Sequence, residues 1–320
     1  MQAFPIRMPP FPRIRIPFLP AGTLLLVIVL LGTLESPLIS SLHGSEPQLI
    51  LPTVSNGSPG PGRRVALKAP EYGQTEVHHM LYLPPDWKPG KTYPVIVEYT
   101  GNHFPTSGST GKIEDAGLGF GITGGRFIWL TLPFVGTEGL QNTNRWWGDI
   151  EATVDYAKRN IPRICRDFGG DPDKVLLCGF SRGAIATNFI GLHDDEIAGL
   201  WCGFITHDHF DGQKPWPRTD WGSPLEHYRK GAAIRLARVK GRPYLVCQNG
   251  GTSRIMEYIA SEISLVGFTF LDVDTRKLMG GFPNALAIHP HNDRWLMVPS
   301  SERDRVWNWV RSVADTSINP

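Results

Sequence analysis

A serine between two glycines stands past the middle of this 320-residue chain, in the segment Gly179-Phe180-Ser181-Arg182-Gly183. The segment fits the pattern G-x-S-x-G, in which a sharp turn from a strand into a helix exposes the serine hydroxyl while the glycines allow close backbone packing. A serine hydroxyl is a poor nucleophile unless an adjacent base takes its proton. The segment therefore predicts a nucleophile at Ser181 that depends on a base elsewhere in the chain.

The residues around this motif have the pattern that such a turn requires. Residues 174–178 are a short apolar run that favours a buried strand, and residues 182–192 carry Ala184, Ala186 and Ile190 at helical spacing. The alternative interpretation is an ordinary strand-to-helix connection in which Ser181 only caps the helix.

Apolar strand patterns and helical patterns alternate along the rest of the chain. Unbroken apolar strands separated by helices favour a mostly parallel sheet covered by helices on both faces, which is the α/β class. Strands are predicted at 76–83, 93–99, 126–135, 174–178, 200–206, 243–247 and 268–273, and helices at 144–163, 182–192, 224–237, 252–263 and 300–313.

With this motif in this context, the chain from about residue 63 to 313 resembles the α/β-hydrolase superfamily, and within it secreted polyester, feruloyl and acetylxylan esterase-like proteins. The resemblance implies a serine hydrolase that cleaves carboxylic esters of small molecules or polymers through an acyl-enzyme and needs no cofactor. It also implies that the orienting acid and then the histidine follow the serine in the chain.

The resemblance places the histidine in a loop between the last strand and the final helix, where the chain reads His289-Pro290-His291-Asn292-Asp293-Arg294-Trp295. His291 is the predicted base, because His-x-Asp-x-Trp just before the closing helix resembles the position that such hydrolases use. His289 is the alternative.

The acid departs from the usual pattern of the superfamily. Most members carry an aspartate soon after the strand predicted at 243–247, but residues 248–254 contain no carboxylate. Some related hydrolases take the acid from the loop after the preceding strand, where Asp208 and Asp211 stand. Asp211 is the predicted acid, Asp208 the next candidate, and the further alternatives are Glu257, Asp272 and Asp274.

Two backbone N–H groups are expected to stabilise the oxyanion that forms on the attacked carbonyl. The first belongs to Arg182, directly after the nucleophile. The second is expected from the loop after the strand at 93–99, at Gly101, although the common His-Gly dipeptide is absent there.

A second kind of chemistry is possible at two histidine-rich segments. His207-Asp208-His209-Phe210-Asp211 and His289-Pro290-His291-Asn292-Asp293 both read H-x-H-x-D, which resembles metallo-β-lactamase-type zinc hydrolases and could hold a divalent metal ion. A third alternative, suggested by the missing aspartate, is an exported binding protein without turnover.

Several tryptophans fall near loops expected at the carboxyl edge of the sheet. Such rings could line a pocket for a sugar or an aromatic acid, or they could serve packing alone. They are Trp146, Trp147, Trp216 and Trp221.

The N-terminal region looks like a targeting segment rather than part of the fold. Arg7, Arg13 and Arg15 precede an apolar run at residues 21–34, which is short for a membrane span. We therefore expect an export signal or N-terminal anchor at 1–43, a Pro/Gly/Ser-rich linker at 44–62 and a catalytic domain at 63–315. The protein is expected to be secreted or periplasmic, with membrane anchoring only through this segment.

Composition limits the other possibilities. Apolar residues make up 41% of the chain, charged residues 19%, and the net charge is +2. These values are typical of a globular enzyme and show no basic surface stripe, so no nucleic-acid partner is expected. The four cysteines, at 165, 178, 202 and 247, lack metal or redox spacing and are expected to be buried thiols, with a disulfide as the alternative.

Overall fold

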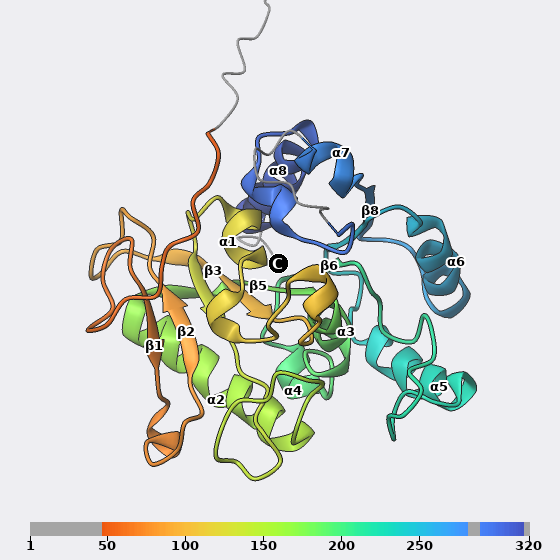
Figure 1. Cartoon of the computed structure of the whole chain (residues 1–320), viewed down its shortest axis with the longest axis horizontal. Coiled ribbons are helices and arrows are strands. Elements are labelled where there is room, and N and C mark those ends of the chain that lie inside the picture. The colour runs from red at the N-terminus through yellow and green to blue at the C-terminus, as the bar shows by residue number, and fades with distance from the viewer. Residues whose placement is uncertain (1–46, 281–288, 317–320) are drawn as a thin grey trace, which may run out of the picture. The chain divides into compact units, whose positions relative to one another are not determined.

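A sheet of eight strands runs through the described part of the protein, in the order β1-β2-β4-β3-β5-β6-β7-β8. The computed structural model in Figure 1 describes residues 47–280 and 289–316. The pairs β1-β2 and β2-β4 are antiparallel, and every later pair is parallel. The strands are β1 (Arg64–Leu67), β2 (His79–Tyr82), β3 (Tyr93–Tyr99), β4 (Ile128–Thr131), β5 (Gly170–Phe180), β6 (Gly203–His207), β7 (Tyr244–Gln248) and β8 (Phe268–Asp272).

Both faces of the sheet are buried, because successive side chains of a strand point to opposite sides. In β3, Val95 and Val97 pack into the cluster that includes side chains of α2, α3, α5 and α6, whereas Ile96 packs into the cluster with α1, α7 and α8. Figure 1 shows α2 and α8 on opposite sides of the sheet. The helices are α1 (Leu118–Thr123), α2 (Ile150–Phe168), α3 (Arg182–Phe189), α4 (Asp195–Ala198), α5 (Leu225–Ala237), α6 (Thr252–Glu262), α7 (Thr275–Met279) and α8 (Ser301–Thr316).

These observations confirm the predicted fold class. The sheet is mostly parallel, helices cover both faces, and the G-x-S-x-G segment connects a central strand, β5, to α3. This is the α/β-hydrolase fold.

The helix predicted at 144–163 differs from the observed α2 at both ends. The observed α2 begins only at Ile150. Asp149 caps it by accepting a hydrogen bond from the N–H of Ala152 at 2.9 Å. It continues through Pro162 and ends at Phe168, before Gly169 with φ 75°. A proline removes one helical hydrogen bond and strains the preceding turn, but the packed apolar face of α2 keeps the helix continuous.

Residues 47–62, predicted to be a linker, contact the domain along their length. The N–H of Leu49 donates to the carbonyl of Met297 at 2.8 Å, and the Arg303 guanidinium donates to the carbonyl of Pro47 at 3.0 Å. The N–H of Ser55 donates to the carbonyl of Arg64 on β1 at 2.8 Å. This segment therefore packs on the domain as an irregular chain.

The segment predicted as an export signal or anchor, residues 1–43, lies outside the described residues. Within 47–280 and 289–316, no helix combines the length and the apolar character that a membrane span needs.

Three of the four cysteines are buried in the apolar core as thiols, namely Cys165, Cys178 and Cys247. Burial raises the pKa of the Cys165 thiol to about 11 and the pKa of Cys178 well above its usual range. These side chains therefore act as small hydrophobic residues.

Candidate active site

Ser181 lies at the turn between β5 and α3 in a strained backbone conformation, with φ 56° and ψ −119°. The flanking glycines make the turn possible, because a Cβ at Gly179 would lie 2.0 Å from the carbonyl oxygen of Gly183, and one at Gly183 would lie 1.8 Å from the carbonyl oxygen of Tyr99. No larger side chain fits at either position. The turn leaves the Ser181 hydroxyl at the carboxyl edge of the sheet, as the motif predicts.

His291 is the histidine that reaches this hydroxyl. Its Nε2 lies 2.8 Å from Ser181 Oγ, although 110 residues separate the two in the chain. The ring of Phe180 packs against the imidazole, with ring centres 4.6 Å apart. The alternative histidine, His289, holds the segment instead, since its Nδ1 accepts a hydrogen bond from the N–H of His291 at 3.1 Å.

Asp208, and not Asp211, is the carboxylate beside this histidine. Asp208 Oδ2 lies 3.2 Å from His291 Nδ1, on the side of the ring opposite to Ser181. The carboxylate of Asp211 is fully buried elsewhere, where Arg235 donates to both of its oxygens at 2.8 and 3.1 Å and the Tyr228 hydroxyl donates at 2.6 Å. The prediction of Asp211 is therefore wrong, because its charge is already paired with Arg235 of α5 and not with His291.

The remaining candidate acids lie on other elements and serve other purposes. Asp272 accepts hydrogen bonds from the N–H and the hydroxyl of Thr252, at the start of α6. Asp274 caps α7 by accepting from the N–H of Lys277, and Glu257 lies on α6 with an exposed side chain. The structure brings none of the three to His291.

The surroundings of Asp208 favour its ionised form. Burial alone would raise its pKa, but His207 and His291 outweigh burial and hold the pKa of this carboxyl well below its usual range. The N–H of Asn249, just after β7, also donates to Asp208 Oδ1 at 2.7 Å. The carboxylate is therefore negatively charged near neutral pH and can stabilise a protonated His291.

The expected oxyanion donors lie on either side of Ser181. Arg182 is the first residue of α3, so its N–H has no partner within the helix. Gly101 lies directly against the nucleophile, since a Cβ there would be 3.2 Å from Ser181 Cβ. Asn102, the next residue, lines the same cavity as Ser181.

The side chain of Arg182 has a role that the sequence did not reveal. Its guanidinium is buried over the ring of Phe134 and donates to the carbonyls of Thr100, Gly101 and Trp146, at 3.3, 2.9 and 2.6 Å. Burial lowers the pKa of Arg182 well below its usual range. One side chain therefore connects the oxyanion loop to Trp146, which lines the cavity.

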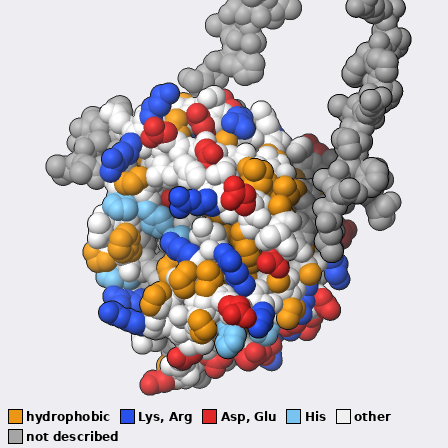
Figure 2. Space-filling model, turned by 90° about the vertical axis from the view of Figure 1, so that its right-hand side faces the viewer, with side chains coloured by type: hydrophobic (Ala, Val, Ile, Leu, Met, Phe, Trp, Pro, Cys, Tyr) orange, Lys and Arg blue, Asp and Glu red, His pale blue; other side chains and the backbone are white. Residues whose placement is uncertain are grey.

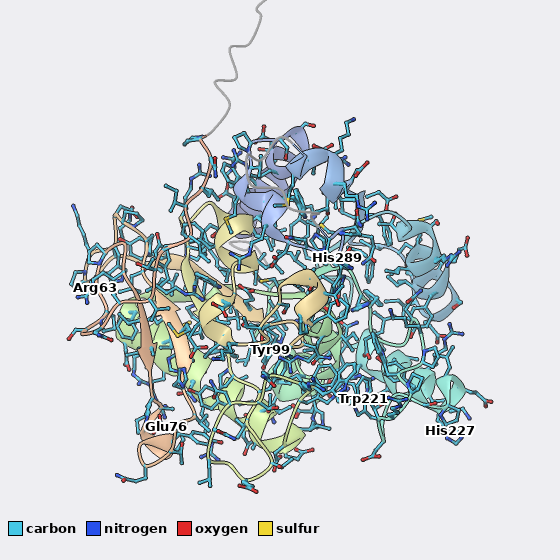
Figure 3. All side chains as sticks on the ribbon, viewed as in Figure 1. Arg63, Glu76, Tyr99, Trp221, His227 and His289 are labelled. Atoms are coloured by element: carbon cyan, nitrogen blue, oxygen red, sulfur yellow. The ribbon has the colours of Figure 1, made fainter. Side chains whose placement is uncertain are left out.

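A cavity of about 320 Å³ opens beside Ser181, with mostly ring side chains in its wall. In Figure 2, histidine and hydrophobic side chains gather around a hollow on this face. In Figure 3, His289 and Trp221 both lie to the right of Tyr99, which ends β3, with His289 above it and Trp221 below it. The lining residues are Asn102, His103, Phe104, Trp146, Ser181, Arg182, His209, Trp216, His289 and His291.

The tryptophans predicted near the sheet edge divide between this wall and the packing behind it. Trp146 and Trp216 line the cavity, with ring centres 5.1 Å apart. Trp147 and Trp221 pack together with Phe189 of α3 behind them. Two of these tryptophans therefore line the cavity and two serve packing.

The histidines of the first H-x-H-x-D segment are already engaged. Trp295 Nε1 donates to His207 Nε2 at 2.6 Å, and His209 Nε2 lies 3.0 Å from the Lys214 ammonium. Burial, followed by the charge of Lys214, lowers the pKa of His209 to about 3, so this ring is neutral. In the described part of the chain, no three His, Cys, Asp or Glu side chains converge as a metal site would require.

Comparison with known proteins finds likeness at the level of structure only. A thermostable esterase matches with a TM-score of 0.43 and 16% identity, over 78% of this chain and 62% of that one. A ferulic acid esterase matches with a TM-score of 0.45 and 15% identity, over 74% and 92% of the two chains. A putative dipeptidyl aminopeptidase IV from Bacteroides ovatus matches with a TM-score of 0.47 and 17% identity, over 79% of this chain and 35% of that one.

The chain thus spans less than two thirds of the thermostable esterase and about a third of the peptidase. No protein-family model and no curated protein matches the sequence.

The two rival acids can be separated by matched substitutions. We expect Asp208→Asn to lower kcat by about 10³- to 10⁴-fold, because the amide no longer fixes the His291 tautomer or stabilises its charged form. We expect Asp211→Asn to leave kcat nearly unchanged but to destabilise the fold, since breaking a buried ion pair costs about 3 kcal/mol. Steady-state kinetics and thermal unfolding of both variants test this, and a larger kcat loss in Asp211→Asn would contradict the assignment.

The Arg182 side chain can be removed while the backbone N–H of that residue stays. We expect Arg182→Met to lower kcat by about 10- to 100-fold with little change in KM, because the loop that carries the second donor loses its anchor. Arg229→Met is the matched control, since Arg229 also donates to backbone carbonyls, those of Gly212 and Gln213, but away from Ser181. Equal kinetic effects in both variants would show that the loop does not depend on Arg182.

Proposed function

We propose that this protein is a serine hydrolase that cleaves carboxylic esters through an acyl-enzyme. The observation that carries the proposal is one line of contacts, in which Ser181 Oγ lies 2.8 Å from His291 Nε2 and His291 Nδ1 lies 3.2 Å from the buried Asp208 carboxylate. A nucleophile, a base and an orienting acid in this order are what acyl transfer requires.

The proposed reaction has two half-steps. His291 Nε2 takes the proton of the Ser181 hydroxyl as Oγ attacks the ester carbonyl, and the N–H of Arg182 with the Gly101 loop stabilises the oxyanion. The protonated His291 then gives its proton to the departing alcohol oxygen, which leaves an acyl group on Ser181. A water molecule, deprotonated by His291, then attacks this acyl group. As the bond to Oγ breaks, His291 returns the proton to Oγ, which releases the acid and restores the Ser181 hydroxyl.

The cavity wall suits an ester with an apolar part, because most of its described residues carry rings. The ring surfaces of Phe104, Trp146 and Trp216 suit an apolar part of a small-molecule or polymer ester.

Two alternatives make different predictions. A metal-dependent hydrolase would use the H-x-H-x-D segments, and a non-catalytic binding protein would not turn over esters at all. The geometry supports the serine hydrolase better than either alternative. His207 and His209 contact Trp295 and Lys214, while Ser181 and His291 are already in contact.

We also propose, from the sequence, that residues 1–43 direct export of the protein or anchor it to a membrane.

The proposal predicts that activity depends on the Ser181 hydroxyl. On short-chain nitrophenyl esters, we expect Ser181→Ala to lower kcat at least about 10³-fold, because the acyl-enzyme cannot form. A serine-directed phosphonate should label the wild type at Ser181, which mass spectrometry of peptides would show, and a chelator should leave activity intact.

Ser261→Ala is the matched control, since its hydroxyl donates to the Tyr258 carbonyl within α6. Undiminished hydrolysis by Ser181→Ala would refute the proposal. Loss of activity with chelator but not with phosphonate would favour the metal-dependent alternative.

A further inference from the structure

His207 and Asp208 are neighbours in the sequence, yet both side chains point into one buried cluster. His207 ends β6, paired between Phe180 of β5 and Cys247 of β7. In a regular strand, successive side chains point to opposite faces. Here Asp208 adopts a left-handed conformation with φ 63°, and its Oδ1 lies 3.3 Å from His207 Nδ1.

Trp295 decides where the proton of His207 sits. The indole N–H can only donate, and Trp295 Nε1 donates to His207 Nε2 at 2.6 Å. The neutral imidazole accepts through one nitrogen and carries its proton on the other. His207 therefore carries its proton on Nδ1, which is the nitrogen that faces Asp208. Both rings are buried, with 1% of His207 and none of Trp295 exposed.

The two oxygens of Asp208 consequently have different partners. Oδ1 lies within reach of two donors, the N–H of Asn249 at 2.7 Å and His207 Nδ1 at 3.3 Å. Oδ2 faces His291 Nδ1 at 3.2 Å. Oδ1 thus accepts the hydrogen bond from Asn249 and lies close to His207 Nδ1, and Oδ2 is left to face His291.

We propose that His207, held in one tautomer by Trp295, is a positioning residue that orients Asp208 toward His291. The inference rests on the proposed function, because the orientation matters only if His291 acts on Ser181. Trp295 and His291 belong to one segment of the chain, so the indole contact also fixes the segment that carries the base.

The contact with His207 matters because Asp208 does not follow β7, where most members of the superfamily carry the acid. The acid here follows β6, whereas the loop after β7 contributes only the N–H of Asn249. A carboxylate at a strained residue with one backbone donor could rotate away from His291. Electrostatic attraction between Oδ1 and the N–H at His207 Nδ1, 3.3 Å away, opposes that rotation.

Two substitutions of His207 separate its hydrogen bond with Trp295 from its contact with Asp208. The amide of Asn can take the place of Nδ1 and donate to Asp208, whereas the longer Gln places its amide near Nε2, where it can bond to Trp295 but not to Asp208. We expect His207→Gln to lower kcat by about 10- to 100-fold, less than loss of the acid itself. We expect His207→Asn to retain most of the wild-type kcat, and we expect KM to change little in either variant, because His207 does not line the cavity.

Replacing any buried histidine can destabilise the fold, so substitutions of His79, a buried histidine outside the site, serve as the control. His79 is 3% exposed on β2, and its Nδ1 bonds to the Tyr156 hydroxyl at 2.7 Å. We expect His79→Gln and His79→Asn to lower the unfolding temperature without changing kcat of the folded enzyme. Trp295→Phe is the second route should a His207 variant fail to fold, and we expect it to lower kcat with KM unchanged.

The outcomes distinguish this inference from the proposed function. If Ser181→Ala is inactive while His207→Gln and Trp295→Phe keep wild-type kcat, only the positioning role is refuted. Equal kcat losses in His207→Asn and His207→Gln would also refute it, because the donor to Asp208 would then be irrelevant. Activity that persists in Ser181→Ala would instead remove the proposed function itself.

Discussion

The site depends on the shared edge at which β5, β6 and β7 end. Phe180 pairs with His207, and His207 pairs with Cys247, so the residues that follow these strands leave the sheet at the same level. Two further backbone bonds extend this register beyond the strands, from the N–H of Ser181 to His207 at 2.9 Å and from that of Asp208 to Cys247 at 3.0 Å. The nucleophile and the acid are therefore positioned by sheet hydrogen bonds, while His291 arrives on a separate segment that needs anchors of its own.

The same edge concentrates backbone strain. Of the non-glycine residues with positive φ, Ser181, Asp208 and Trp146 all belong to the site. Each such residue costs on the order of 1 kcal/mol or more and persists only where its surroundings hold it. Here the surroundings are identifiable, because glycines admit the turn at Ser181, Asn249 and His207 hold Asp208, and Arg182 holds the carbonyl of Trp146. Backbone strain therefore coincides with the nucleophile, the acid and a residue of the cavity wall.

Local sequence pattern was sufficient for some parts of this arrangement and not for others. The strand, the turn and the helix around Ser181 could be predicted because each has its own short-range signal, and the loop of His291 could be placed by its position before the last helix. Asp208 and Asp211 could not be told apart, since both follow β6. The choice depends on φ at Asp208 and on Arg235, which lies 24 residues beyond Asp211 and neutralises it. Contacts of Arg182 and Trp295 likewise join segments distant in the chain, which periodicity does not encode.

Arg182 affects both the stability of the protein and its proposed chemistry. A guanidinium removed from water costs free energy, and every described hydrogen-bond acceptor of this one is a carbonyl or hydroxyl oxygen rather than a carboxylate. An apolar side chain of similar size could make the interior more robust while loosening the loop beside the nucleophile. Selection for thermal stability alone would then replace arginine at this position, whereas selection for turnover would retain it.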